Sequence, residues 1–393
     1  MLGVLKDTAV YAITFALTLF FCIIADKALQ KKRRKEFFAS SAMALLIPCL
    51  LAGVRAETVG TDIGVYAKPL FDSLCSSGFA GIGTQGVSLE YGYELMAATV
   101  ATLTRSFPVF LSVSQLAVIL PIYMVACKRS RETPIWFTMA IYLLVFYCAS
   151  FNLMRQCISG ALALLAFQYF EEKSYIKSIL CIAIGMLFHN SILIGVAIYA
   201  CAYSIKLIRQ NSIQRLMIVL IVLVVVVVYS QWYNILSMLI EIGILPEKYS
   251  TYLSIFTGDY FAYQSYYFEL TYSNYIECAY RIWFALLGFV FTYRTLRRRS
   301  QQNAGVYMTT MIICALINLL TMVVLHSSYG IRIVWNNEFI LLLLLPSLFQ
   351  CNSRSIKKAT PRMFVIEMSI LSYFLLGYVL LGWHGVRPFE FAI

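Results

Sequence analysis

Long apolar runs separated by short basic clusters constrain this chain more than any other feature. The runs at 8–25, 37–54 and 108–127 contain no charged residue. About 20 such residues are enough to cross a bilayer as a helix. Lipid offers the backbone no hydrogen-bond partners, so only helices and closed barrels cross it. Because the runs lack the period-two alternation of barrel strands, the sequence predicts an all-α, polytopic membrane protein.

The charges between the runs predict how the spans are oriented. Basic residues collect on cytoplasmic loops, and the cluster at 31–35 follows the first run. This places both termini outside, with about 10–12 spans of roughly 20 residues each. The expected spans are 8–25, 37–54, 108–127, 134–151, 152–170, 216–229, 277–293, 306–326, 333–349 and 363–383. The remaining apolar stretch, 175–205, starts and ends on basic clusters, which predicts two short helices broken near His189.

Two long segments are expected on the outer side, at 55–107 and 231–276. The first contains a predicted helix from Glu90 to Thr104 that lies near the membrane surface. The second is rich in tyrosine, whose ring suits both a membrane interface and the face of a sugar ring. The sequence leaves these two roles of the tyrosines open.

Composition and motifs exclude several classes of function. The net charge of +12 comes from short clusters between spans, a topological pattern rather than a nucleic-acid surface, so no nucleic-acid partner is expected. The eleven cysteines are scattered without a CxxC pair, which favours packing over metal binding or disulfides. The HExxH, GxSxG and P-loop motifs are missing from the sequence. We expect neither a metal nor a cofactor.

Three arginines lie on the predicted outer side of the membrane, where basic residues are uncommon. Arg55, Arg155 and Arg332 each fall at the outer mouth of a predicted span. A charge beside hydrocarbon is costly unless it is paired or faces a cavity, so such residues are candidates for function. The planar guanidinium group suits phosphate oxygens. For Arg55 an ion pair with Glu57 or Asp62 is an equally open interpretation.

Further polar residues accompany these arginines. Asn152, Arg155, Gln156 and Ser159 share one helix face by their spacing, which suits either a substrate or hydrogen bonds between helices. Asp62 follows Gly60 in a loop and has the chemistry to accept a proton or orient a sugar hydroxyl. His189 lies at the predicted break, where a structural role is the commoner one for a lone histidine.

Taken together and in order, the motifs resemble the EpsG family of Wzy-type polysaccharide polymerases. The similar segments are GVRAETVGTDIGVY from residue 53, SLEYGYEL from 88, FNLMRQCISGALAL from 151, LFHNSIL from 187 and YGIRIVWNNEFILLLLLP from 329. A Pro-aromatic tail at Pro388 completes the series. Ile63 departs from the aromatic residue or threonine that is common in the family, and the segment 231–276 shows no match. The sugar specificity therefore stays open.

The resemblance implies a glycosyltransferase in the bacterial cytoplasmic membrane, with one membrane-embedded domain over 1–393. Such enzymes transfer a growing glycan from undecaprenyl pyrophosphate to a sugar hydroxyl of the next lipid-linked repeat unit, on the outer face. The product is O-antigen, capsule or exopolysaccharide. A chain-length regulator is a further expected partner, beside the bilayer and the lipid-linked oligosaccharide. A lipid-linked oligosaccharide flippase and an O-antigen ligase are the alternative functions.

The resemblance also suggests roles for the candidate residues. Arg155 and Arg332, with Arg55 as a third candidate, are expected to bind the pyrophosphate and stabilise the charge of the leaving group. Asp62 or His189 is the expected general base, and the sequence does not choose between them. The residues expected to bind sugar or support the site are Asn152, Gln156 and Tyr66.

Overall fold

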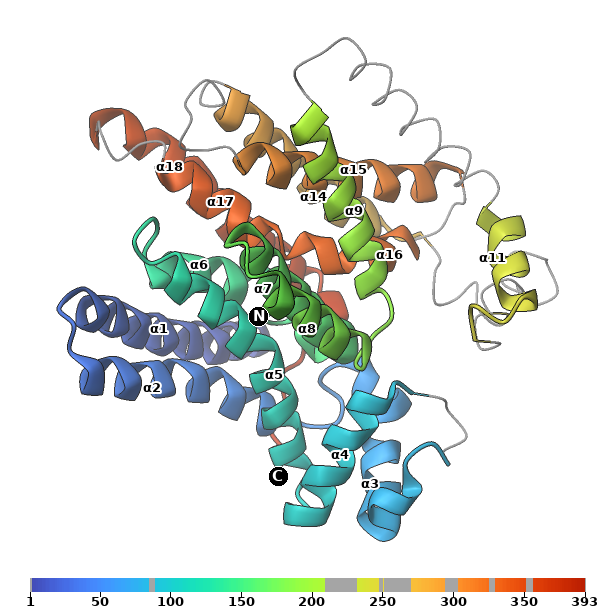
Figure 1. The fold of residues 1–393 in the computed structure, drawn as a ribbon. Helices are drawn as coiled ribbons and strands as arrows, with labels where there is room; N and C mark the ends of the chain where they lie inside the picture. The colour runs from blue at the N-terminus through green and yellow to red at the C-terminus, as the bar shows by residue number, and fades with distance from the viewer. Residues whose placement is uncertain are drawn as a thin grey trace.

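Apolar residues of high helical propensity make the chain helical almost throughout. The computed structural model describes residues 2–84, 89–208, 232–246, 250, 270–293, 303–324, 329–350 and 356–392. Within these ranges every regular element is a helix, and the only extended pairing is an isolated bridge between Arg55 and Phe391 (Figure 1). The prediction of an all-α polytopic protein is confirmed.

The helices differ widely in length. The long ones are α1 (Leu2–Gln30), α2 (Arg34–Gly53), α5 (Phe107–Lys128), α7 (Met154–Glu171), α14 (Tyr272–Tyr293), α15 (Ala304–Val324) and α18 (Ile356–Tyr373). Shorter ones are α3 (Lys68–Ser77), α4 (Tyr91–Thr104), α6 (Ile135–Ile141), α8 (Tyr175–Met186), α9 (Ile192–Ile208), α11 (Trp232–Glu241), α16 (Tyr329–Glu338) and α17 (Leu341–Gln350). Brief π or 3₁₀ segments are η1 (Ile63–Ala67), η2 (Gly78–Gly81), η3 (Tyr142–Phe146), η4 (Ala149–Phe151), η7 (Phe374–Leu380) and η8 (Trp383–Gly385).

Two opposite ends of the molecule organise the fold. At the end that we call the tail end, Asp7 of α1 accepts hydrogen bonds from the Arg387 side chain and the Phe389 backbone, at 3.3 and 3.1 Å. At the other end, the basic end, the turn between α1 and α2 carries Lys31, Lys32 and Arg33. The 29 residues of α1 separate the two ends by about 40 Å. Residues near both termini therefore lie at one end, as predicted.

Five of the described helices are long and apolar enough to cross a membrane: α1, α2, α5, α15, and α18 with its continuation η7. A sixth span results if α16 and α17, which are bent by 49°, count as one. Helices α6, α8 and α9 are apolar but shorter. The predicted span at 216–229 and half of the segment 231–276 lie outside the described residues.

The predicted break near His189 is confirmed. Helix α8 ends at Met186 and α9 begins at Ile192, so His189 lies in the turn between them. The predicted outer helix is also present as α4, and its second residue, Gly92, donates a backbone hydrogen bond of 2.8 Å to the Leu187 carbonyl in this turn. The α8–α9 turn therefore lies against the segment 55–107, which the charge pattern predicts to be on the outer side.

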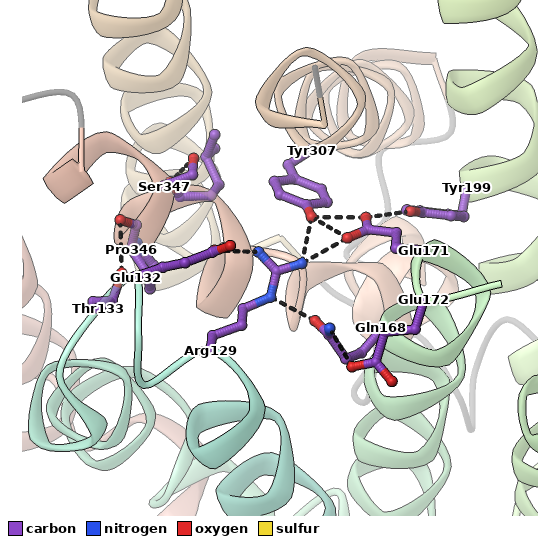
Figure 2. Close-up of polar contacts among 11 residues, drawn as sticks. Arg129, Glu132, Thr133, Gln168, Glu171, Glu172, Tyr199, Tyr307, Pro346 and Ser347 are labelled. Atoms are coloured by element: carbon purple, nitrogen blue, oxygen red, sulfur yellow. Dashed lines mark hydrogen bonds and ion pairs between the residues drawn. The ribbon is translucent and has the colours of Figure 1, made fainter. Parts of the chain in front are cut away.

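A polar network closes the basic end. Arg129, just after α5, donates to the Glu171 carboxylate and the Tyr307 hydroxyl at 2.6 and 2.7 Å (Figure 2). The same arginine binds Gln168, and Tyr199 donates to Glu171 at 2.8 Å. A buried ion pair is costly to break because the remaining charge loses its partner. The network thus fixes the ends of α5, α7 and α15 and the middle of α9 relative to one another.

Candidate functional site

A cavity of about 310 Å³ opens at the tail end. Its volume lies at the lower end of the range of small-ligand sites. It is formed by the turn before α7, the first turns of α14, the start of α16 and the segment after η7. The lining mixes amide, carboxylate, guanidinium, imidazole and indole groups: Asn152, Leu153, Ser273, Asn274, Glu277, Ile331, Arg332, Leu381, Gly382, Trp383 and His384.

Three π-helical segments lead into this region. Segment η1 follows Asp62 directly, η3 comes shortly before Asn152, and η7 ends just before the lining residue Leu381. Wide π turns interrupt the regular register of a helix and are frequent at functional sites. Their positions favour a functional role for the surroundings of the cavity.

Gly60 allows the first outer loop to approach the turn before α7. Its φ is +96°, and a Cβ atom at this position would lie 2.5 Å from the Phe151 carbonyl oxygen. Its backbone N–H donates to the Gly385 carbonyl at 3.0 Å, and the Thr61 hydroxyl donates to Asn152. The Gly-Thr-Asp motif therefore packs against both the turn before α7 and the C-terminal tail.

Asp62 lies in a cluster with two of the predicted arginines. The Tyr66 hydroxyl donates to its carboxylate, and the guanidinium of Arg155 covers the Tyr66 ring at 4.6 Å. Burial raises the pKa of Asp62 above its ordinary value, although the Tyr66 hydrogen bond and the charges of Arg332 and Arg155 lower it. Arg155 also forms an ion pair with Glu90. Asp62 is thus a partly buried carboxylate close to two guanidinium groups.

Gln156 and His189 form a layer next to the cavity lining. The Gln156 side chain donates to the Arg332 carbonyl and, at 3.5 Å, to the Ser191 hydroxyl. Ser191 is 2.5 Å from Nδ1 of His189, and Ser159 donates to the His189 carbonyl at 3.1 Å. The polar face of α7 therefore joins the α8–α9 turn to α16. His189 is engaged in this joint and does not line the cavity.

Arg55 lies apart from the cavity. It is 2% exposed, donates to the Ala52 carbonyl at 3.0 Å, and lies 4.1 Å from the centre of the Phe151 ring. Burial lowers its pKa to about 10. The isolated bridge to Phe391 holds its backbone against the tail. Arg55 thus packs behind the turn that carries Asn152, and its predicted contact with the pyrophosphate stays a prediction.

The structure adds charged residues that the sequence interpretation passed over. Glu277 lines the cavity and pairs with Arg281 at 2.8 Å, and Arg281 also pairs with Glu338. All three lie at the edge of or inside predicted spans, so the cost of charge in hydrocarbon that marked Arg155 was a usable signal for them as well. His384 follows the last span alone, and its residue type and position gave no comparable signal.

His384 is held by Asn152. Nδ1 of the histidine lies 3.3 Å from the Asn152 side-chain nitrogen. Burial lowers the pKa of His384 to about 4; the charge of Glu277 raises it, and those of Arg281 and Arg332 lower it further. The imidazole is therefore neutral in the folded protein at physiological pH.

We expect His384 to make folding stability fall as the pH drops from 6.5 towards 4. The pKa is about 6.5 in the unfolded chain and about 4 in the folded one, so the unfolded state binds more protons between these values. The contribution is complete above about pH 6.5 and is lost progressively on acidification. Thermal unfolding of the detergent-solubilised protein should be less sensitive to pH over this window in His384→Gln than in the wild type. Equal slopes for the two proteins would contradict the expectation.

One of the comparisons with known proteins identifies a family. No group of three or more His, Cys, Asp or Glu side chains that could hold a metal occurs among the described residues. The model of the EpsG family matches residues 40–391, a range that includes all residues of the cavity and of the Asp62 cluster. Members of this family are Wzy-type polymerase-like. No curated protein and no solved structure matches the chain. The chain therefore belongs to the EpsG family.

Proposed function

We propose that the chain is a polysaccharide polymerase that transfers a growing glycan from undecaprenyl pyrophosphate to a sugar hydroxyl of the next lipid-linked repeat unit. The reaction takes place at the tail end, which in the proposed topology faces outward from the cytoplasmic membrane. One observation carries the proposal. Three segments far apart in sequence bring Asp62, then Asn152 with Arg155, and Arg332 to one cavity and its rim.

Arg332 and Arg155 suit the leaving group. During transfer the bond between the first sugar and the pyrophosphate breaks, and negative charge develops on the phosphate oxygens. Arg332 lines the cavity, and Arg155 lies close enough to act electrostatically on the same carboxylate, Asp62. Guanidinium groups bind phosphate oxygens through paired N–H donors, and preorganised donors stabilise developing charge. Arg55 supports the turn beneath them.

Asp62 is the better placed of the two candidate bases. The acceptor hydroxyl attacks the anomeric carbon of the donor and loses its proton, which a nearby carboxylate can accept. Asp62 has its Tyr66 hydrogen bond and two cations nearby, whereas Nδ1 of His189 is bound within the α8–α9 turn. In the proposal Asn152 binds sugar hydroxyls, and Gln156 and Tyr66 position Arg332 and Asp62.

A deletion strain tests this function. Cells that lack the chain should carry surface glycan with a single repeat unit, and the wild-type gene should restore a ladder of polymer lengths. A flippase or a ligase predicts instead that surface glycan is absent from the deletion strain. That outcome would replace the polymerase proposal by one of these alternatives.

A further inference from the structure

Glu277 is the carboxylate in the wall of the cavity. It lies in the second turn of α14 and is 6% exposed. Oε1 accepts a hydrogen bond of 2.8 Å from Arg281 one helical turn further on. This arrangement occupies one oxygen of the carboxylate and leaves Oε2 for a group inside the cavity.

Arg281 is already paired on its other side. It is 4% exposed, its Nε donates to Glu338, and its guanidinium lies 5.8 Å from the centre of the Trp335 ring. A buried arginine needs a partner, because an isolated charge in such a place is costly. Glu338 provides that partner. Glu277 adds a second carboxylate to the same guanidinium, and this second carboxylate is the one that lines the cavity.

Partners suited to a sugar ring surround Glu277. The amides of Asn152 and Asn274 and the hydroxyl of Ser273 line the same cavity, and so does Arg332. Side-chain amides both donate and accept hydrogen bonds, and a carboxylate accepts them from hydroxyl groups. A few convergent polar groups of this kind fix the orientation of a ligand in a pocket.

We infer that Glu277 binds a hydroxyl of the donor sugar that is attached to the pyrophosphate at Arg332. The inference rests on the proposed function and extends it to the substrate class. Arg281 holds the carboxylate in place from behind. A sugar with its own carboxylate would be repelled by Glu277, so the sugar in this position carries no carboxylate.

Glu277→Gln tests the inference, and Glu338→Gln is its matched control. Both variants remove one carboxylate from Arg281, but only the first changes the cavity wall. The assay uses purified protein in liposomes, with lipid-linked repeat units extracted from the deletion strain as substrate. We expect Glu277→Gln to raise KM for the repeat unit about tenfold, the effect of losing a hydrogen bond to a charged group. Glu338→Gln should lower the melting temperature and leave KM within about twofold of wild type.

The outcomes separate the inference from the function on which it rests. Equal KM changes in the two variants would show that Glu277 only pairs with Arg281, and would overturn the inference alone. An uronic acid as the first sugar of the extracted repeat unit would do the same. A wild-type protein that makes no polymer would overturn both. If Glu277→Gln does not fold, Glu277→Asp keeps the charge but withdraws it from the cavity, and the same rise in KM is expected.

Discussion

Arg332→Ala should lower the rate of glycan transfer about a hundredfold to a thousandfold and leave cells with single repeat units. The side chain lines the cavity, and its backbone carbonyl is fixed by Gln156. Its charge lowers the pKa of both Asp62 and His384, so the guanidinium acts on both carboxylate and imidazole. In other enzymes, removal of one preorganised hydrogen-bond donor to a developing anion lowers the rate by a similar factor.

Initial rates in liposomes measure the effect, with a second arginine as control. Arg131 is exposed in the loop after α5 at the basic end, so Arg131→Ala removes the same charge away from the cavity. Its rate should stay within about twofold of wild type. Arg332→Lys keeps the charge but loses the planar fork, and an intermediate rate is expected. An Arg332→Ala protein that retains a third of the wild-type rate would exclude this residue from the pyrophosphate site.

Features that depend on the solvent rather than on tertiary contacts could be predicted from the sequence. Lipid requires continuous apolar helices, so the limits of α2 and α5 follow closely from the runs of uncharged residues, whereas α1 extends beyond its run at both ends. The break between α8 and α9 was predictable because basic clusters at both ends of 175–205 require the chain to return to the same side. In each case the physical constraint acts on a local stretch of sequence.

The details of the cavity could not be predicted in this way. Arg55 has the residue type and position of a phosphate ligand, yet the bridge to Phe391 and the ring of Phe151 place it behind the site. That placement depends on contacts between segments more than 300 residues apart, such as the hydrogen bond from Ala56 to Glu390. Helical periodicity and loop charge contain no information about such pairs.

In the candidate site, too, some features could be predicted from the sequence and others could not. Arg155 and Gln156 lie on α7 at the predicted helical spacing, whereas Asn152 lies in the turn before α7 and not on the predicted helical face; all three side chains still reach the region of the cavity. Glu277 was overlooked because only positive charges on the outer side were treated as exceptions. A carboxylate at a helix end looks ordinary until the bundle places it beside Arg332.

Arg155→Ala should stop polymer formation, and its effect on catalysis can be measured separately from its effect on stability. Arg155 pairs with Glu90, whose side chain is 8% exposed. Loss of the arginine leaves a buried carboxylate without its cation, which costs about 3–5 kcal/mol of stability. Adding Glu90→Gln removes that charge, so the double variant should recover most of the melting temperature of the wild type.

The double variant should regain stability but not the rate of glycan transfer. The guanidinium of Arg155 lies over Tyr66 and acts on Asp62 as well as on Glu90, so a neutral residue at position 90 does not replace its role at the leaving group. We expect the double variant to transfer glycan at least about a hundredfold more slowly than wild type, and Glu90→Gln alone to lose less than tenfold. Melting temperatures and initial rates of the four proteins form the cycle. If the double variant regains both stability and rate, Arg155 acts only as the structural partner of Glu90, and Arg332 alone would have to bind the pyrophosphate.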